Sequence, residues 1–193
     1  MKNVAIFASG SGTNAQAIIE YLHKGNIARV ACIFSNNKNA YVLNRAENKQ
    51  IPSYTFNRDE FYNSNRIIEL LENHSADFIV LAGFLWLVPK NLIMMYPDRI
   101  INIHPALLPN YGGKGMYGMK VHQTVIENGE NESGISIHYV NEKYDEGNII
   151  FQATCKIDPG DTPEKLAEKI HQLEYAHFPK VVEKLVSELV TNK

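Results

Sequence analysis

Residues 99–109 read RIINIHPALLP, and the expected fold is organised around this stretch. Its three isoleucines predict a short buried strand, because β-branched side chains fit a pleated surface. Pro105 has no N–H to donate and does not continue a helix, so the strand is expected to end at His104. Asn102 and His104 are two residues apart and therefore share one face of the strand. An amide and an imidazole thus meet at the carboxyl end of a buried strand, where open α/β sheets place their active sites.

Apolar and helical segments alternate along the chain. Strands are expected at residues 4–8, 30–34, 53–56 and 77–81, and helices at 15–22, 41–49, 57–71 and 89–96. Such alternation predicts a parallel sheet, to which residues 134–140 and 148–156 add a hairpin-like pair. We therefore expect an α/β fold with an open, mostly parallel twisted sheet flanked by helices. This Rossmann-like sheet is expected to carry an antiparallel strand addition in the C-terminal half.

Proline and glycine mark the last two predicted helices. The first of them covers residues 121–128 and ends at Gly129. Thr162 and Pro163 are typical of a helix start, because the hydroxyl caps the helix and proline fits its first turn. Pro179 is expected to break this final helix in two, since proline removes a backbone hydrogen bond from a helix interior.

Length and composition indicate one globular domain. The chain has 193 residues, of which 45% are hydrophobic and 21% are charged, so it can bury a core. No repeat, low-complexity tract or linker interrupts the sequence. We expect a single domain over residues 1–193.

Charge and cysteine usage exclude several classes of protein. A formal net charge of −2 gives no basic footprint, so nucleic acid is not an expected partner. A strand begins close to Met1, which leaves no room for a signal peptide, and the most apolar stretch, residues 78–88, is too short to span a bilayer. Cys32 and Cys155 lie in apolar runs and are expected to be buried thiols. The sequence therefore predicts a cytoplasmic protein that does not enter a membrane.

Residues 9–14 read SGSGTN and join the first expected strand to the first helix. A glycine turn at a helix start offers free N–H groups and the positive end of the helix dipole, so this stretch predicts a phosphate site. Gly10, Gly12 and Ala15 also fit the G-x-G-x-x-A dinucleotide pattern. Residues 35–37 read SNN, where a ribose-binding acid would be needed, which favours a single phosphate. A tight turn of small residues without a ligand is the other alternative.

Asp145 joins Asn102 and His104 in the predicted constellation, because it stands at an Asp-x-Gly corner between the last two strands. The amide can donate to a developing oxyanion, the imidazole can move a proton, and the carboxylate can orient or charge the imidazole. We expect neither covalent acyl chemistry, for which no Ser or Cys elbow is present, nor a metal site. His138 could line the cleft, but the favoured interpretation is a strand histidine with a local hydrogen bond. The other histidines are assigned to surface or helix packing: His23, His74, His122, His171 and His177.

Four motifs in chain order resemble one family. They are SGSGTN at 9–14, LAGF at 81–84, INIHPALLP at 101–109 and YDEG at 144–147. Together they are similar to the motifs of the phosphoribosylglycinamide formyltransferases, folate-dependent enzymes of purine synthesis. The Asn-x-His-Pro motif with a downstream Asp-x-Gly is typical of folate-dependent formyltransferases, and the glycine loop narrows the resemblance to members that use a ribonucleotide.

The resemblance implies a role for each matched position. Within the single domain it implies an N-terminal phosphate-binding half over about 1–100 and a C-terminal folate-binding and catalytic half over about 101–193. It implies that the catalytic residues are Asn102, His104 and Asp145. For the substrate it implies phosphate contacts at Gly12, Thr13 and Asn14 and a ribose contact at Glu174. For the folate it implies Arg58 at the outer end and Leu85, Trp86, Leu87, Val88, Asn102, Asn141, Glu142, Lys143, Tyr144 and Asp145 around the pterin. The chain departs from some members at Leu85-Trp86, where these carry Met-Arg. Its four glycines between residues 111 and 118 predict a mobile loop.

The implied reaction is direct formyl transfer from the co-substrate 10-formyltetrahydrofolate to the amine of 5-phosphoribosylglycinamide, without a metal. Asn102 and protonated His104 are expected to hold the oxyanion, and Asp145 is expected to raise the pKa of the imidazole. The implied partners are these two small molecules, and the implied assembly is a monomer or homodimer. Related alternatives are methionyl-tRNA formyltransferase and formyltetrahydrofolate deformylase, each expected to need an additional domain. A regulator that binds nucleotide or folate without turnover is the alternative from another class.

Overall fold

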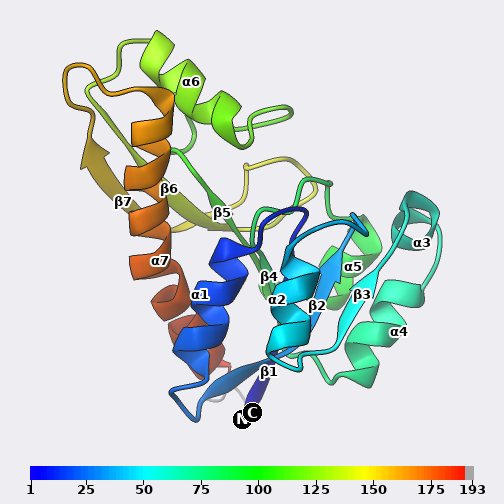
Figure 1. Cartoon of the computed structure of the whole chain (residues 1–193). Coiled ribbons are helices and arrows are strands. Elements are labelled where there is room, and N and C mark those ends of the chain that lie inside the picture. Colours follow the sequence, from blue (N-terminus) through cyan, green and yellow to red (C-terminus); the bar gives the residue numbers. More distant parts are fainter. Residues whose placement is uncertain (190–193) are drawn as a thin grey trace.

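The computed structural model describes residues 1–189, which form one seven-stranded sheet with helices on both faces (Figure 1). The strands are β1 (Lys2–Phe7), β2 (Ala28–Ser35), β3 (Ser53–Thr55), β4 (Phe78–Leu81), β5 (Ile100–His104), β6 (Glu132–Tyr139) and β7 (Ile149–Lys156). The helices are α1 (Thr13–Leu22), α2 (Val42–Asn48), α3 (Arg58–Tyr62), α4 (Arg66–Asn73), α5 (Lys90–Met95), α6 (Met119–Glu127) and α7 (Pro163–Glu188).

The strand order of the sheet is β3-β2-β1-β4-β5-β6-β7. The first five strands of this order run parallel, β6 pairs antiparallel with β5, and β7 pairs antiparallel with β6. This confirms the predicted α/β fold with its antiparallel addition. The order reverses direction between β1 and β4, and such a reversal opens a crevice at the carboxyl ends of the strands.

The first strand shows why the sheet is covered on both sides. Val4 and Ile6 are buried with residues of α1, α2 and α7, whereas Ala5 and Phe7 are buried with residues of α3, α4 and α5. Figure 1 shows α1 and α7 together on one side of the sheet and α3 and α4 on the other. Successive side chains of a strand point to opposite faces, so a strand with two buried faces must be apolar throughout.

Residues 57–71 form two helices, so the prediction of a single helix is wrong. The predicted cap is present, because Asn57 Oδ1 accepts a hydrogen bond from the Glu60 N–H and the Glu60 carboxylate accepts one from the Asn57 N–H. Helix α3 ends where the Ser64 hydroxyl donates to the Glu60 carbonyl at 2.8 Å. Because Asn and Ser side chains compete with the backbone for such groups, the polar run at 63–65 separates α3 from α4.

The final helix is continuous, so the predicted break at Pro179 is also wrong. Thr162 caps α7 and Pro163 opens it, as expected. Pro179 lies buried inside the 26-residue helix, which packs against α1, β6 and β7. A proline removes one backbone hydrogen bond, and we attribute the continuity to the burial of the apolar face of α7 on both sides of this position.

The two cysteines differ in their surroundings. Cys32 on β2 is buried and free, as predicted, whereas Cys155 is free but only half-buried because β7 is the edge strand of the sheet. Within residues 1–189, no helix combines the length and the apolar character needed to cross a membrane. Residues 111–118 form the irregular connection that leads from β5 towards α6, and the mobility of this connection stays a prediction.

Candidate active site

A cavity of about 630 Å³ lies at the carboxyl ends of the parallel strands. Residues 9–14 line it after β1, residues 82–85 after β4, residues 102–105 at the end of β5, and residues 113–118 from the glycine-rich connection. The volume is within the range that proteins use for small-molecule ligands. The cavity therefore lies where the reversal of strand order between β1 and β4 is expected to open a crevice.

The loop at residues 9–14 has the geometry of an anion site. Gly12 caps α1 with a φ of 72°, and a Cβ at this position would lie 2.5 Å from Cγ2 of Val42, so only glycine fits. Among the described residues, no side chain caps the N–H groups that open α1. Thr13 and Asn14 form the first turn and line the cavity. The three residues predicted to bind phosphate thus lie at an uncapped helix N-terminus.

Glu174 of α7 lies opposite this helix start. Its side chain is largely buried, and its Oε2 accepts a hydrogen bond from Asn14 Nδ2 at 2.8 Å. Burial raises the pKa of Glu174 to about 7, although the hydrogen bond from Asn14 lowers it. Within residues 1–189, Asn14 Oδ1 has no hydrogen-bond partner. The two side chains therefore present buried polar atoms beside the loop at residues 9–14, where a polar ligand can replace their mutual contact.

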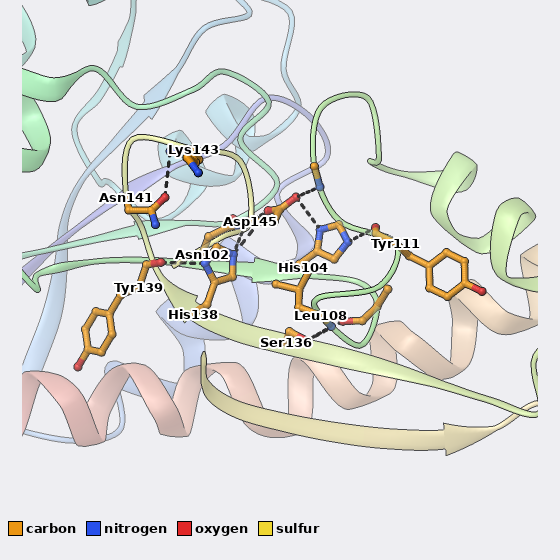
Figure 2. Close-up of polar contacts among 12 residues, drawn as sticks. Asn102, His104, Leu108, Tyr111, Ser136, His138, Tyr139, Asn141, Lys143 and Asp145 are labelled. Carbon is orange, nitrogen blue, oxygen red and sulfur yellow. Dashed lines mark hydrogen bonds and ion pairs between the residues drawn. The ribbon is translucent and has the colours of Figure 1, made fainter. Parts of the chain in front are cut away.

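Asn102, His104 and Asp145 meet on the wall of the cavity (Figure 2). Asn102 Nδ2 donates to Asp145 Oδ1 at 3.3 Å, and His104 Nδ1 lies 3.5 Å from Asp145 Oδ2. The His104 side chain is 4% exposed and that of Asp145 is 12% exposed. Because alternate residues of β5 share one face, both side chains reach the same carboxylate. The structure thus brings together the three side chains that the sequence proposes as a constellation.

Both ring nitrogens of His104 face hydrogen-bond acceptors. Nε2 donates to the Tyr111 carbonyl at 2.7 Å, and Nδ1 faces the Asp145 carboxylate. This arrangement suits the doubly protonated imidazolium. Burial nevertheless lowers the pKa of His104 below its ordinary value, outweighing the opposite effects of Asp145 and the Tyr111 carbonyl. Asp145 thus raises the pKa of the imidazole, as expected, but the desolvation of the buried ring lowers that pKa by more.

His138 of β6 is a fourth member of the constellation. Its Nδ1 donates to the Tyr139 carbonyl at 2.8 Å, which is the predicted local hydrogen bond. In the neutral ring the proton is therefore on Nδ1, so Nε2 accepts a hydrogen bond from Asn102 Nδ2 at 3.1 Å. The pairing of β5 with β6 places Asn102 opposite His138. Sequence reasoning missed this contact because nothing in the sequence fixes the register of the two strands.

Asp145 is held by groups from three segments. Its Oδ2 accepts a hydrogen bond from the Gly113 N–H at 2.9 Å, and its Oδ1 lies 3.6 Å from His138 Nε2. Burial raises the pKa of Asp145, but the charge of His104 and the Gly113 N–H hold it below its ordinary value. The carboxylate is therefore ionised at neutral pH and fixed against the imidazole of His104.

Gly147 completes the corner that presents Asp145. A Cβ at position 147 would lie 1.7 Å from the carbonyl oxygen of Tyr139 on β6, so the loop can approach the strand only with glycine there. The backbone of Asp145 has a φ of 56°, in the left-handed region that side chains rarely adopt. The Asp-x-Gly motif is thus a requirement of close packing between the loop and β6.

Gly147→Ala is expected to destabilise the protein by about 1–3 kcal/mol, because the added methyl must displace the loop from β6. Urea unfolding of the wild type and the variant measures this difference. Gly10→Ala is the matched control, since a Cβ at Gly10 meets nothing within 4 Å and should leave the unfolding midpoint unchanged. Equal midpoints for Gly147→Ala and Gly10→Ala would contradict the packing role of Gly147.

A second, smaller recess of about 50 Å³ adjoins the constellation. Of the residues predicted to contact folate, it is lined by Trp86, Leu87, Val88, Asn102, Lys143, Tyr144 and Asp145. Leu85 lines the larger cavity instead, and Asn141 and Glu142 line neither. Asn141 Oδ1 accepts a hydrogen bond from the Lys143 N–H. The Glu142 carboxylate lies 3.4 Å from the ammonium of Lys90, the first residue of α5, at the entrance to the recess. Arg58 lies over the Trp86 ring, with its guanidinium carbon 4.8 Å from the ring centroid.

Two histidines assigned to packing line the larger cavity. His122 of α6 is buried, and burial together with the charge of His171 lowers its pKa to about 4. His171 of α7 is half-buried, stacks on Tyr175, and also lines the cavity. The position of a histidine in a helix does not show which other element its side chain faces. The sequence alone therefore could not predict that these two histidines line the cavity. Within residues 1–189, no group of three or more His, Cys, Asp or Glu side chains is placed to hold a metal ion.

Comparison with known proteins agrees with this geometry. The Formyl transferase family model matches residues 2–182. The chain belongs to the formyl transferase family. It is 40% identical over 187 residues to the phosphoribosylglycinamide formyltransferase of Haemophilus influenzae, covering 94% of this chain and 86% of the relative. It is 38% identical to that of Bacillus subtilis, covering 96% and 95%. The crystal structure of phosphoribosylglycinamide formyltransferase from Bacillus halodurans superposes with a TM-score of 0.86 at 36% identity, covering 97% of each chain.

As a member of this family, the chain confirms the resemblance drawn from its four motifs. Three of them, at residues 9–14, 81–84 and 101–109, lie at the carboxyl ends of β1, β4 and β5. The fourth, at residues 144–147, lies in the loop between β6 and β7. Motifs that are separate in this formyl transferase sequence thus surround one crevice.

Proposed function

We propose that this chain transfers a formyl group from 10-formyltetrahydrofolate to the amine of 5-phosphoribosylglycinamide in purine synthesis. The observation that carries the proposal is that Asn102 and Asp145 line both cavities at once. One cavity ends in an anion site, and the other is walled by apolar side chains. A group that passes between two such ligands must pass these two side chains. The names of the relatives in Haemophilus influenzae and Bacillus subtilis support the same reaction.

The ribonucleotide occupies the larger cavity. Its phosphate lies at the start of α1, where Gly12, Thr13 and Asn14 offer N–H groups, and its ribose lies against Glu174. The glycine amine then reaches the constellation at the opposite end of the cavity. A volume of about 630 Å³ accommodates a molecule of this size.

The formyl donor enters through the smaller recess. Its pterin lies among Trp86, Leu87 and Val88 and the loop at residues 141–145, and its outer carboxylate lies near Arg58. The recess of about 50 Å³ is smaller than a pterin ring, so Lys143 and Tyr144 at its edge move outward when the donor binds, while Asp145 keeps its contacts with His104 and Gly113. The formyl carbon is then presented to Asn102 and His104.

The amine attacks the formyl carbon, and the carbonyl oxygen becomes an oxyanion. Both N–H bonds of Asn102 have acceptors in the free protein, at His138 Nε2 and Asp145 Oδ1. The contact with Asp145 is long at 3.3 Å, and the developing oxyanion replaces it. His138 keeps the Asn102 amide oriented throughout, because its Nε2 has only a lone pair to offer.

His104 and Asp145 then move the proton. A neutral imidazole, as burial favours, accepts the proton that the attacking nitrogen loses, and the acceptors around both ring nitrogens stabilise the imidazolium so formed. The proton passes to N10 of the folate as the bond from N10 to the formyl carbon breaks. Formylated amine and tetrahydrofolate result, and no metal takes part in this scheme.

Incubation of the protein with both substrates tests the proposal. We expect the absorbance of tetrahydrofolate to appear only when both substrates are present. Omission of the ribonucleotide controls for hydrolysis of the donor, which is the reaction of a deformylase. Binding of both ligands without product would favour a regulator and contradict the proposal.

The phosphate loop is expected to bind a monophosphate and not a dinucleotide. Ribose 5-phosphate at 100 times its Kd should stabilise the protein by about 2.7 kcal/mol, whereas NAD and NADP should have little effect. Thermal unfolding with each ligand measures this. Gly12→Ala, compared with its own ligand-free midpoint, should lose the stabilisation because the loop cannot keep its turn. Stabilisation by a dinucleotide alone would overturn the assignment.

We further propose that residues 1–193 act as one domain. Glu174 from the second half of the chain lies beside the phosphate loop of the first half, which supports a single functional unit. A cytoplasmic location and a monomeric or homodimeric assembly complete the proposal.

A further inference from the structure

Arg58 differs from the other arginines of the chain. Four of the five arginines donate a hydrogen bond: Arg29 to Asn3, Arg45 to Ser11, Arg66 to Glu60 and Arg99 to Met95. The side chain of Arg58 forms no hydrogen bond or ion pair with any of residues 1–189. Its guanidinium lies instead over the face of Trp86. Its guanidinium therefore keeps its donors available for an external acceptor.

Trp86 is itself held firmly. It is the only tryptophan of the chain, and it lines the recess that we assign to the formyl donor. Tyr62 stacks on it with ring centroids 6.2 Å apart, and Phe61 lies 5.8 Å away. The Tyr62 hydroxyl also donates to the Leu87 carbonyl at 3.0 Å, which ties helix α3 to the segment that carries Trp86. The ring thus has a fixed position between α3 and the recess.

We propose that Trp86 is a positioning residue that holds Arg58 for a carboxylate at the outer end of the formyl donor. This inference rests on the proposed function. Arg58 is the first residue of α3, and its exposed side chain would sample many rotamers without the ring. A cation over an aromatic face is attracted to it while its N–H groups stay free at the edge. Restricting the guanidinium before the ligand arrives lowers the entropy cost of binding.

The other side of the recess supports a charged tail. Lys143 and Tyr144 line it from the facing loop. The Lys143 ammonium is already paired with Glu146 at 2.9 Å. Lys90, which begins α5, is paired with Glu142 at 3.4 Å. Of these three cations, Arg58 is the one without a carboxylate partner among the described residues, so it is the one that can bind the carboxylate of the tail.

The KM for the formyl donor tests the proposal. Trp86→Leu is expected to raise the KM for 10-formyltetrahydrofolate about tenfold, with kcat and the KM for the ribonucleotide within about twofold of wild type. Trp86→Phe retains an aromatic face and should raise the KM for 10-formyltetrahydrofolate less. For the diamide of 10-formyltetrahydrofolate, in which both glutamate carboxylates are neutral, Trp86→Leu should raise the KM less than for 10-formyltetrahydrofolate, because only the contact of Trp86 with the pterin is lost. An equal rise for both donors would make Trp86 a wall of the pterin pocket and nothing more, and would overturn the proposal.

A double-mutant cycle separates positioning from structural support. Arg58→Met should raise the KM for 10-formyltetrahydrofolate, and the double variant should be no worse than Trp86→Leu alone, because Arg58 is no longer held once the ring is removed. Arg99→Met is the matched control, because Arg99 also lies over a ring, 5.1 Å from the Tyr96 centroid, but outside both cavities. Additive effects, or an unchanged KM in Trp86→Leu and Trp86→Phe, would overturn the proposal.

Ligand binding without turnover distinguishes this proposal from the proposed function. The fluorescence of Trp86 should change when unreactive 5-formyltetrahydrofolate binds, and Arg58→Met should weaken that binding about tenfold. This result without formyl transfer in the wild type would sink the proposed reaction and leave the role of Trp86 standing. Formyl transfer by the wild type, with equal affinity for 5-formyltetrahydrofolate in Arg58→Met and wild type, would leave the proposed reaction standing and overturn the role of Trp86.

Discussion

His104→Ala is expected to lower kcat about 100- to 1,000-fold, and so is Asn102→Ala. The imidazole is the only titratable ring within reach of both Asp145 and the Tyr111 carbonyl in the described structure, so nothing else there can take the proton it carries. The Asn102 amide is the only side-chain amide of the described chain that bonds Asp145, and its loss leaves the oxyanion without that donor. Stopped-flow measurement of tetrahydrofolate release gives both values.

Unfolding experiments must accompany the kinetics, because both side chains are packed in the crevice. We expect each variant to keep a cooperative unfolding transition. His74→Ala is the control for removing an imidazole, since His74 hydrogen-bonds Tyr54 at 2.6 Å and lines neither cavity. Wild-type turnover in a folded His104→Ala or Asn102→Ala protein would remove that residue from the mechanism.

Asp145→Asn is expected to lower turnover about 100-fold by acting through His104. The carboxylate opposes the effect of burial on the ring, so its removal should lower the pKa of His104 further. Activity that needs neutral His104 is lost as the pH falls through the pKa of the ring. The acidic limb of the pH profile should therefore move to lower pH in the variant, and NMR titration of the ring should move with it.

A double-mutant cycle with His104→Ala completes this test. Groups that act as one unit are strongly non-additive, so Asp145→Asn combined with His104→Ala should be little worse than the poorer single variant. Asp161→Asn is the matched control, because Asp161 is also an aspartate of lowered pKa but is bonded to Lys169 away from the crevice. Additive losses with an unmoved His104 pKa would leave Asp145 as a loop-folding residue only.

Much of the fold could be predicted because it depends on short-range patterns. Continuous apolar runs predict the strands that are buried on both faces, and Asn57 and Thr162 mark their helix starts by local hydrogen bonds. The predictions that are wrong concern the middles of helices. At residues 63–65 the local competition of polar side chains ended a helix, and at Pro179 the burial of α7 outweighed a missing hydrogen bond.

The sequence by itself determined which residue types stand at the ends of which strands, and hence the proposed trio of Asn102, His104 and Asp145. Only the tertiary structure decided that His138 orients the Asn102 amide, because that contact depends on the register between β5 and β6. It likewise decided that burial outweighs the charge of Asp145 on the pKa of His104, since desolvation is a property of the whole surrounding and not of any motif.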